Sequence, residues 1–184
     1  MRVISGYLKG RKIDGYNIDG TRPTMDRVKE SIFAIIQNHI SDSIVLDLFA
    51  GSGNYGIEAI SLNSSLVYFN DKNKEAVKVI KRNLENLNIK DKGIVYNLDY
   101  LKCLNLLKDD KIKFDLVFLD PPYNMHILNE ILEYMEKNKL LNINSYVIVE
   151  LNYDNMKDEY GNLKKFKSKR YGEKIVYIYK YLGE

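Results

Sequence analysis

The stretch from Val45 to Gly56 constrains the fold more than any other part of the chain. It reads VLDLFAGSGNYG, an apolar run that contains Asp47 and leads into three glycines. The apolar residues 44–49 predict a buried strand, and the residues that follow predict a helix at about 54–62. Because glycine lacks a Cβ atom, its backbone can turn tightly and lie close to a ligand. A strand, a glycine-rich turn and a helix in this order predict a nucleotide-binding α/β fold.

Apolar runs with strand character alternate with helical periodicity from residue 44 to residue 151. This alternation predicts βαβ units and a mostly parallel, Rossmann-like sheet. Residues 163–171 and 174–181 predict antiparallel closing strands, joined by a turn at 171–173. The N-terminal residues predict a hairpin at 2–13 and a helix at 25–40. The expected strands are 44–49, 66–69, 93–98, 114–119 and 146–151, and the expected helices between them are 54–62, 74–87, 101–107 and 126–135.

Length and composition favour one cytoplasmic domain. A chain of 184 residues is long enough for a complete core, so we expect a single domain, with residues 1–40 as an extension and 41–184 as the catalytic core. No apolar run approaches the roughly 20 residues of a membrane span, and the N-terminus has no signal-peptide pattern. Cys103 is the only cysteine, so it can form no intrachain disulfide, and we expect it to be a buried apolar residue.

Acidic side chains follow three consecutive strands after the glycine loop. Asp71 lies 20 residues after Gly51, a spacing that suits hydrogen bonds to a ribose. Asp99 has the position of an acceptor for an adenine amino group. Asp47, inside an apolar strand, needs a partner, either backbone N–H groups of the glycine loop or a cationic part of a ligand. Any one of the strand-end carboxylates Asp71, Asp99 and Asp120 is alone typical of a helix cap or a solvated loop, but their shared position with the glycine loop at one sheet edge predicts a binding site.

Residues 120–123, Asp-Pro-Pro-Tyr, are the most specific motif of the chain. Two prolines fix an extended backbone, which holds the Asp120 carboxylate and the Pro121 carbonyl in place. Two adjacent acceptors suit an –NH2 group, and accepting its hydrogens makes the nitrogen lone pair available for attack. Tyr123 is then placed to stack on the base. A double proline without the upstream glycines and acids commonly marks only a rigid turn.

With these motifs, the chain resembles class I S-adenosylmethionine-dependent methyltransferases that act on exocyclic amines of nucleobases. Its segments ISGYLKGRK (4–12), TRPTMDRVKE (21–30) and KRYG (169–172) narrow the resemblance to the bacterial 16S rRNA (guanine-N2)-methyltransferase D family. The resemblance covers almost the whole chain. The segment RPTMDR (22–27) is its most discriminating part, because Asp-Pro-Pro-Tyr also occurs in adenine-N6 DNA methyltransferases.

The resemblance implies methyl transfer to N2 of a guanine in 16S rRNA, within an assembled or nearly assembled 30S particle. It implies S-adenosyl-L-methionine as cofactor. His39 and His126 are far apart in the sequence and no ligand cluster is visible, so we expect no metal. The sequence does not indicate an oligomeric state, and a monomer is the default expectation. The candidate catalytic residues are Asp120, Pro121 and Tyr123. The candidate cofactor-binding residues are Asp47, Phe49, Gly51, Gly53, Asp71, Asp99 and Asp120.

Both ends of the chain are basic. Residues 1–29 carry a net charge of +4 and residues 160–184 carry +5, whereas the residues between them carry −6. A solvated surface and a polyanion-binding surface explain this pattern about equally well. If the partner is rRNA, the candidate RNA-binding residues are Lys9, Arg11, Lys12, Arg22, Arg27, Lys169 and Arg170.

Three other functions compete with this interpretation. An adenine-N6 DNA or RNA methyltransferase shares Asp-Pro-Pro-Tyr, but the chain has no insertion large enough for a sequence-reading domain. An NAD-dependent oxidoreductase is compatible with the literal Gly-x-Gly-x-x-Gly of residues 51–56, yet it leaves Asp-Pro-Pro-Tyr without a role. A noncatalytic ribosome-assembly factor requires neither an intact glycine loop nor Asp120.

Overall fold

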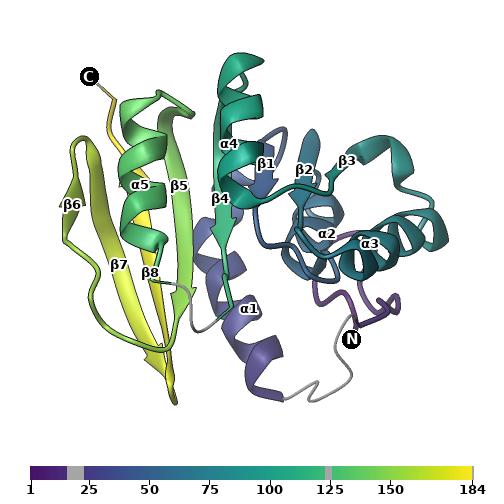
Figure 1. The fold of residues 1–184 in the computed structure, drawn as a ribbon. Coiled ribbons are helices and arrows are strands. Elements are labelled where there is room, and N and C mark those ends of the chain that lie inside the picture. The colour runs from purple at the N-terminus through teal and green to yellow at the C-terminus, as the bar shows by residue number, and fades with distance from the viewer. Residues whose placement is uncertain (16–22, 123–125, 184) are drawn as a thin grey trace.

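The computed structural model of this protein describes residues 1–15, 23–122 and 126–183, with the side chains of 23–25 left out. These residues form one sheet with the strand order β3-β2-β1-β4-β5-β8-β7-β6 (Figure 1). The strands are β1 (Ile44–Asp47), β2 (Leu66–Asn70), β3 (Gly93–Tyr96), β4 (Phe114–Leu119), β5 (Leu141–Leu151), β6 (Glu159–Tyr160), β7 (Leu163–Tyr171) and β8 (Lys174–Tyr181). Neighbouring strands from β3 to β5 are parallel, and β8, β7 and β6 continue the sheet in antiparallel pairs. The predicted Rossmann-like fold class is therefore confirmed.

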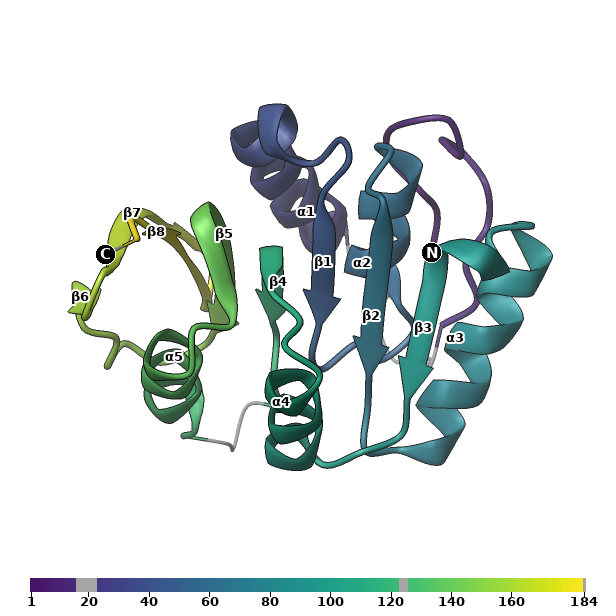
Figure 2. The same ribbon diagram turned by 90° about the horizontal axis from the view of Figure 1, so that it is seen from above.

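Helices cover both faces of this sheet. They are α1 (Pro23–Ile36), α2 (Asn54–Ser61), α3 (Lys74–Asn86), α4 (Tyr100–Asp109) and α5 (Leu128–Lys137), with short 3-10 helices η1 (Gln37–His39) and η2 (Lys90–Lys92). Apolar residues of α1, α2 and α3 share one core with one side of the strands. Those of α4 and α5 share a second core with the other side (Figure 2). Two covered faces explain why the central strands are apolar on both sides.

Most element boundaries agree with the sequence predictions, and the exceptions have local causes. The predicted strand 44–49 ends at Asp47, where the chain leaves the ladder for the glycine loop. The strand predicted at 146–151 begins earlier, at Leu141. Polar residues and the positive φ of Asn144, 66°, hide this extension in the sequence. A register shift against β4 falls within it, between Leu141 and Tyr146. The two-residue strand β6 has no sequence signal.

The N-terminal residues fold back on themselves, as the predicted hairpin requires, although only one bridge is formed. Arg2 pairs with Lys12, and Val3 exchanges backbone hydrogen bonds with Gly10 and Arg11. This segment lies along α2 and α3. The C-terminal β7–β8 hairpin lies at the other end of the sheet, and α1 lies between the two (Figures 1 and 2).

The topology places the carboxyl ends of the parallel strands at one edge. From β1, the strand order runs through β2 to β3 in one direction and through β4 to β5 in the other. Ligands of open α/β sheets bind outside the carboxyl ends at such a reversal. The glycine loop follows β1, and Asp120 directly follows β4, so the two strongest sequence motifs meet at this point.

Candidate active site

Two glycines with left-handed backbone conformations shape the loop between β1 and α2. Gly51 and Gly53 have φ angles of 56° and 82°, a region that residues with a Cβ atom rarely adopt. A Cβ atom on Gly51 would meet nothing within 4 Å, so the backbone here is open to a ligand. Asp71, directly after β2, accepts hydrogen bonds from the N–H groups of Gly51 and Asn73, both at 2.9 Å. The loop is thereby joined to the neighbouring strand end.

Gly56 has a packing role. A Cβ atom there would lie 2.2 Å from a ring carbon of Phe69 on β2, closer than any real contact allows. The glycine therefore lets α2 pack directly against the sheet. This close packing explains the third glycine of the pattern without a dinucleotide ligand.

Asp47 meets the loop as the sequence predicts. Its carboxylate is 3% exposed and accepts a hydrogen bond from the Gly56 N–H at 3.0 Å. Burial raises the pKa of Asp47 to about 7, because the charged form loses its hydration; Asp71 adds to the rise and the Gly56 bond opposes it. A buried carboxylate with this environment favours a cationic ligand group, such as the ammonium of an amino acid.

Strand register brings Asp120 onto the same face of the sheet as Asp47. Asp47 of β1 is paired with Phe118 of β4, and residues that pair across parallel strands point to the same side. Asp120 follows Phe118 by two residues, so it shares that side by strand alternation. Phe118 packs in the core formed with α1 and α2, which identifies the face.

The same register extends to β5 and β8. Ile148 of β5 is paired with Phe118, and Glu150, two residues on, is paired with Val176 of β8. Lys174 precedes Val176 by two residues and forms an ion pair with Glu150. Four side chains therefore lie side by side across adjacent strands at the carboxyl edge. We call them the charged row: Asp47, Asp120, Glu150 and Lys174.

Glu150 is fixed from two directions. It is 4% exposed, pairs with Lys174 and accepts a hydrogen bond from the Tyr55 hydroxyl at 2.5 Å. Tyr55, on α2, also stacks on Phe118 with ring centroids 5.1 Å apart. The cation that pairs with Glu150 comes from β8, because β8 is the antiparallel neighbour of β5.

Asp120 is a half-buried carboxylate beside other carboxylates. Burial raises its pKa well above the ordinary value, the neighbouring charges of Glu150 and Asp47 raise it further, and Lys174 lowers it. A carboxylate with a raised pKa accepts protons and hydrogen bonds more strongly than an exposed one. The arrangement therefore suits an acceptor for a polar N–H group at the strand ends.

The remaining predicted site residues differ in their exposure and contacts, and two of them are not described by the structure. Asp99 is exposed and caps α4 by accepting from the Leu101 N–H at 3.0 Å, the local role that a single carboxylate commonly takes. Phe49 is half-buried, 6.0 Å from the ring of Tyr100, and Pro121 is buried. Tyr123 and Arg22 lie outside the described residues.

Two buried asparagines that the sequence analysis did not identify support the site. The Asn70 side chain bonds the Leu48 and Leu98 carbonyls and accepts from the Leu98 N–H, so it joins three strand ends. Asn83 of α3 donates to the carbonyl of Ser52 in the glycine loop at 3.0 Å and bonds both backbone groups of Asp14. The one signal for Asn83 in the sequence is its position as a polar residue on the apolar face of α3, with Ile80 and Leu84.

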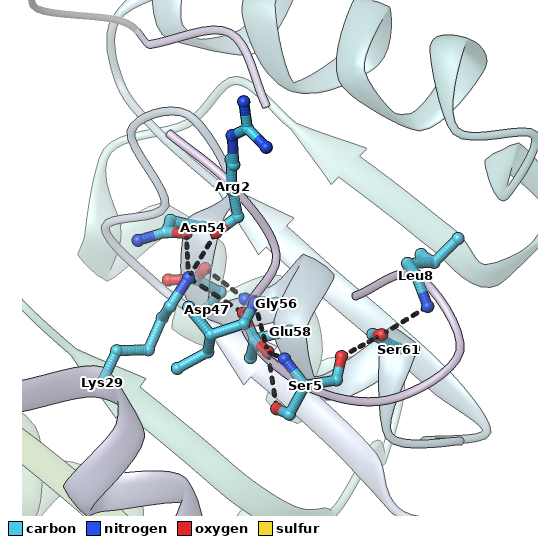
Figure 3. Close-up of polar contacts among 10 residues, drawn as sticks. Arg2, Ser5, Leu8, Lys29, Asp47, Asn54, Gly56, Glu58 and Ser61 are labelled. Carbon is cyan, nitrogen blue, oxygen red and sulfur yellow. Dashed lines mark hydrogen bonds and ion pairs between the residues drawn. The ribbon is translucent and has the colours of Figure 1, made fainter. Parts of the chain in front are cut away.

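A buried ion pair joins the N-terminal segment to the glycine loop (Figure 3). Lys29 of α1 lies 2.9 Å from Glu58 of α2, with side chains 1% and 0% exposed, and it donates to the Asn54 side chain at 2.8 Å. Glu58 accepts from the backbone N–H groups of Ile4 and Ser5 and from the Ser5 hydroxyl. Residues 4–5, α1 and α2 therefore meet at one polar centre behind the glycine loop.

The predicted RNA-binding residues that the structure describes are spread over the N-terminal segment, α1 and both faces of β7. Lys9 and Arg11 are exposed on the N-terminal segment, where Arg11 donates to the carbonyl of Asn86 at the end of α3. Lys169 is on the α1 side of β7, beside Val176, and its ammonium lies 5.0 Å from the ring centre of Tyr171. Lys12 and Arg27 are exposed on the N-terminal segment and α1, and Arg170 is exposed beside Ile175, on the other face of the sheet.

Other parts of the described chain give no competing centre. Hollows near His39 and near Tyr7 lie at the amino ends of the strands, away from Asp120. Among residues 1–15, 23–122 and 126–183, no group of His, Cys, Asp and Glu has the geometry to hold a metal ion. No helix in these ranges is long and apolar enough to cross a membrane. Cys103 is buried as expected, and burial raises the pKa of its thiol to about 12.

Known proteins resemble the chain over its whole length. The family described as Conserved hypothetical protein 95 matches residues 1–180. YlbH of Bacillus subtilis, provisionally named an rRNA methyltransferase, is 35% identical over 184 residues, and the alignment covers 100% of this chain and 100% of YlbH. Ribosomal RNA small subunit methyltransferase D of Haemophilus influenzae is 36% identical over 158 residues, with 84% of this chain and 80% of the relative covered. A solved Escherichia coli structure with the provisional methyltransferase name yhhF is 27% identical, with a TM-score of 0.87 over 100% of this chain and 99% of that one.

Proposed function

Because the chain belongs to the ribosomal RNA small subunit methyltransferase D family of class I S-adenosylmethionine-dependent methyltransferases, we propose that it methylates N2 of a guanine in 16S rRNA. The substrate is an assembled or nearly assembled small ribosomal subunit, and the enzyme acts as a monomer without a metal. The observation that carries the proposal is the position of Asp120, which follows β4 beside the glycine loop and within the charged row.

The described residues fit S-adenosylmethionine. The open backbone at Gly51 and the buried carboxylate of Asp47 suit its amino-acid end, and Gly53 gives the loop its turn. Each Asp71 oxygen accepts one backbone bond and retains a lone pair for a ribose hydroxyl. Phe49 and Asp99 are assigned to the adenine end. When bound, the cofactor supplies an electrophilic methyl group.

The chain's own groups prepare the guanine amine for attack. The Asp120 carboxylate and the Pro121 carbonyl accept its two hydrogens, which orients the nitrogen lone pair. On accepting a methyl group the amine nitrogen must give up one proton, and Asp120 would be the acceptor of that proton. Tyr123 holds the ring. The target guanine must leave its stack to reach this position.

For the rRNA contact we assign the exposed basic residues near the carboxyl edge. Arg27 is on α1 one turn before Ser31, which is hydrogen-bonded to Tyr171 of β7, and Lys169 lies over the ring of Tyr171. These two cations therefore belong to adjoining elements. Arg22 is assigned to the same contact, and Lys9, Arg11, Lys12 and Arg170 to more distant phosphates. Binding should weaken steeply with salt, because each phosphate contact releases counterions.

The test is methylation of purified 30S subunits, free 16S rRNA and duplex DNA by the wild type and Asp120→Asn, followed by nucleoside mass spectrometry. The proposal expects N2-methylguanosine from the RNA substrates, with the 30S subunit preferred, and a loss of at least about 100-fold in Asp120→Asn, comparable to loss of one oriented acceptor or donor. N6-methyladenine as the product, or full activity of Asp120→Asn, would refute it.

A further inference from the structure

The charged row contains two side chains that the proposed methyl transfer does not use. Asp47 faces the glycine loop and Asp120 faces the amine, but Glu150 and Lys174 have no role in that chemistry. Glu150 is a nearly inaccessible carboxylate placed beside another carboxylate on the adjacent strand. Like charges that lie opposite each other destabilise a sheet, and an apolar pair of similar volume often stabilises a core at least as well as a buried ion pair. Fold stability alone therefore does not account for these two residues.

The contacts of Glu150 hold its charge in one position. Its two oxygens have different partners: the Tyr55 hydroxyl bonds Oε2, and the Lys174 ammonium pairs with Oε1. Tyr55 is itself held by stacking on Phe118, two residues before Asp120. One negative and one positive charge are thus fixed at the same strand ends as the Asp120 carboxylate.

We propose that Glu150 and Lys174 are positioning residues for Asp120, and that their ion pair, anchored by Tyr55, sets the charge and orientation with which Asp120 meets the amine. The inference rests on the proposed function of Asp120. The positive charge of Lys174 favours the ionised form of the Asp120 carboxylate, and the negative charge of Glu150 opposes it. Together the two charges leave Asp120 ionisable and still able to take up a proton. Neither residue touches the substrate in this assignment.

The direction of each effect follows from the charges. Among the described residues, the groups that face Asp120 are Asp47 from β1, Glu150 from β5, Lys174 from β8 and the phenol of Tyr55 from α2. Removing the cation in Lys174→Met leaves two carboxylates beside Asp120, which raises the pKa of Asp120. Removing the anion in Glu150→Gln leaves the cation, which lowers that pKa. A charge within about 4–6 Å typically moves a carboxyl pKa by 1–3 units.

The experiment has one readout without catalysis and one with it. The pKa of Asp120 is followed by carboxyl-carbon NMR in the cofactor-free full chain, with Asp120→Asn assigning the signal. In parallel, the pH dependence of single-turnover rRNA methylation gives the midpoint of its acid limb. Both should move up by about one pH unit or more in Lys174→Met and down in Glu150→Gln, and the double variant E150Q/K174M should return near the wild-type value.

The outcomes separate the inference from the proposed function. Shifts in the same direction in both variants, or no shift, overturn the inference even if the wild type methylates rRNA, since loosened packing alone would move both variants alike. Opposite NMR shifts in a protein that methylates no rRNA support the electrostatic assignment and refute the proposed reaction. If Lys174→Met does not fold, the comparison of Glu150→Gln with E150Q/K174M still measures the effect of the cation, which must lower the pKa of Asp120.

Discussion

Replacing Lys29 by methionine removes the cation of the buried centre behind the glycine loop. Methionine has similar length, so the change deletes charge and hydrogen bonds with little loss of volume. The ammonium lies 2.9 Å from Glu58 and 2.8 Å from the Asn54 side chain, and both members of the ion pair are inaccessible. Glu58 then remains buried with only the donors of Ile4 and Ser5.

The expected cost is about 3–5 kcal/mol of unfolding free energy, because removal of one partner leaves an uncompensated buried charge. For a domain of this size, each kcal/mol lowers the melting temperature by roughly 2–4 °C. Urea denaturation of the cofactor-free protein measures the free energy directly. The double variant K29M/E58Q should recover part of the loss, since it no longer buries an unpaired carboxylate.

Lys78→Met is the matched control. Lys78 pairs with Glu75 at 2.8 Å, but the side chains are 72% and 67% exposed, so solvent screens the pair and its loss should cost less than about 0.5 kcal/mol. Equal stabilities of Lys29→Met and Lys78→Met would contradict the reasoning. So would a double variant less stable than Lys29→Met itself.

Three further outcomes follow from the site. Burial raises the pKa of Asp47 from 3.8 to about 7, so the folded state binds this proton more tightly and loses stability as pH rises through that window. Cofactor-free Asp47→Asn should therefore lose less unfolding free energy than the wild type between pH 4 and 8 in urea titrations. Gly56→Ala, whose Cβ meets Phe69, should cost at least about 1–3 kcal/mol in the same assay. Asp71→Asn should lower the affinity for S-adenosylmethionine measured by calorimetry, and Asp47→Asn should lower it further. Unchanged affinity in both variants would refute the cofactor assignment.

The sequence predicted those parts of the site whose geometry is local. The turn after β1 needs glycines at positive φ, and the buried Asp47 needs a donor, which Gly56, nine residues on, supplies. The double proline after β4 restricts its own backbone. In each case the cause and its structural effect lie within a few residues, so pattern and spacing were enough.

Partners that lie far apart in the sequence could not be predicted from local pattern and spacing. The partner of Glu150 depends on which strand lies beside β5, and no local pattern indicates that strand. The antiparallel register of β8 decides that Lys174 faces Glu150, and a slip of one residue would turn the lysine to the other face. The same limit applies to Lys29 and Glu58, which come together only when α1 packs against α2.

The sequence by itself determined the alternating fold, the glycine loop, the acids at the strand ends and the Asp-Pro-Pro-Tyr motif, because periodicity, glycine and proline act through local backbone physics. Only the tertiary structure decided that Asp47, Asp120, Glu150 and Lys174 form one row, and that residues 1–15 and the β7–β8 hairpin lie on opposite sides of α1. Strand order and register set these neighbours, and both result from the packing of the whole sheet. Local propensity does not contain that information.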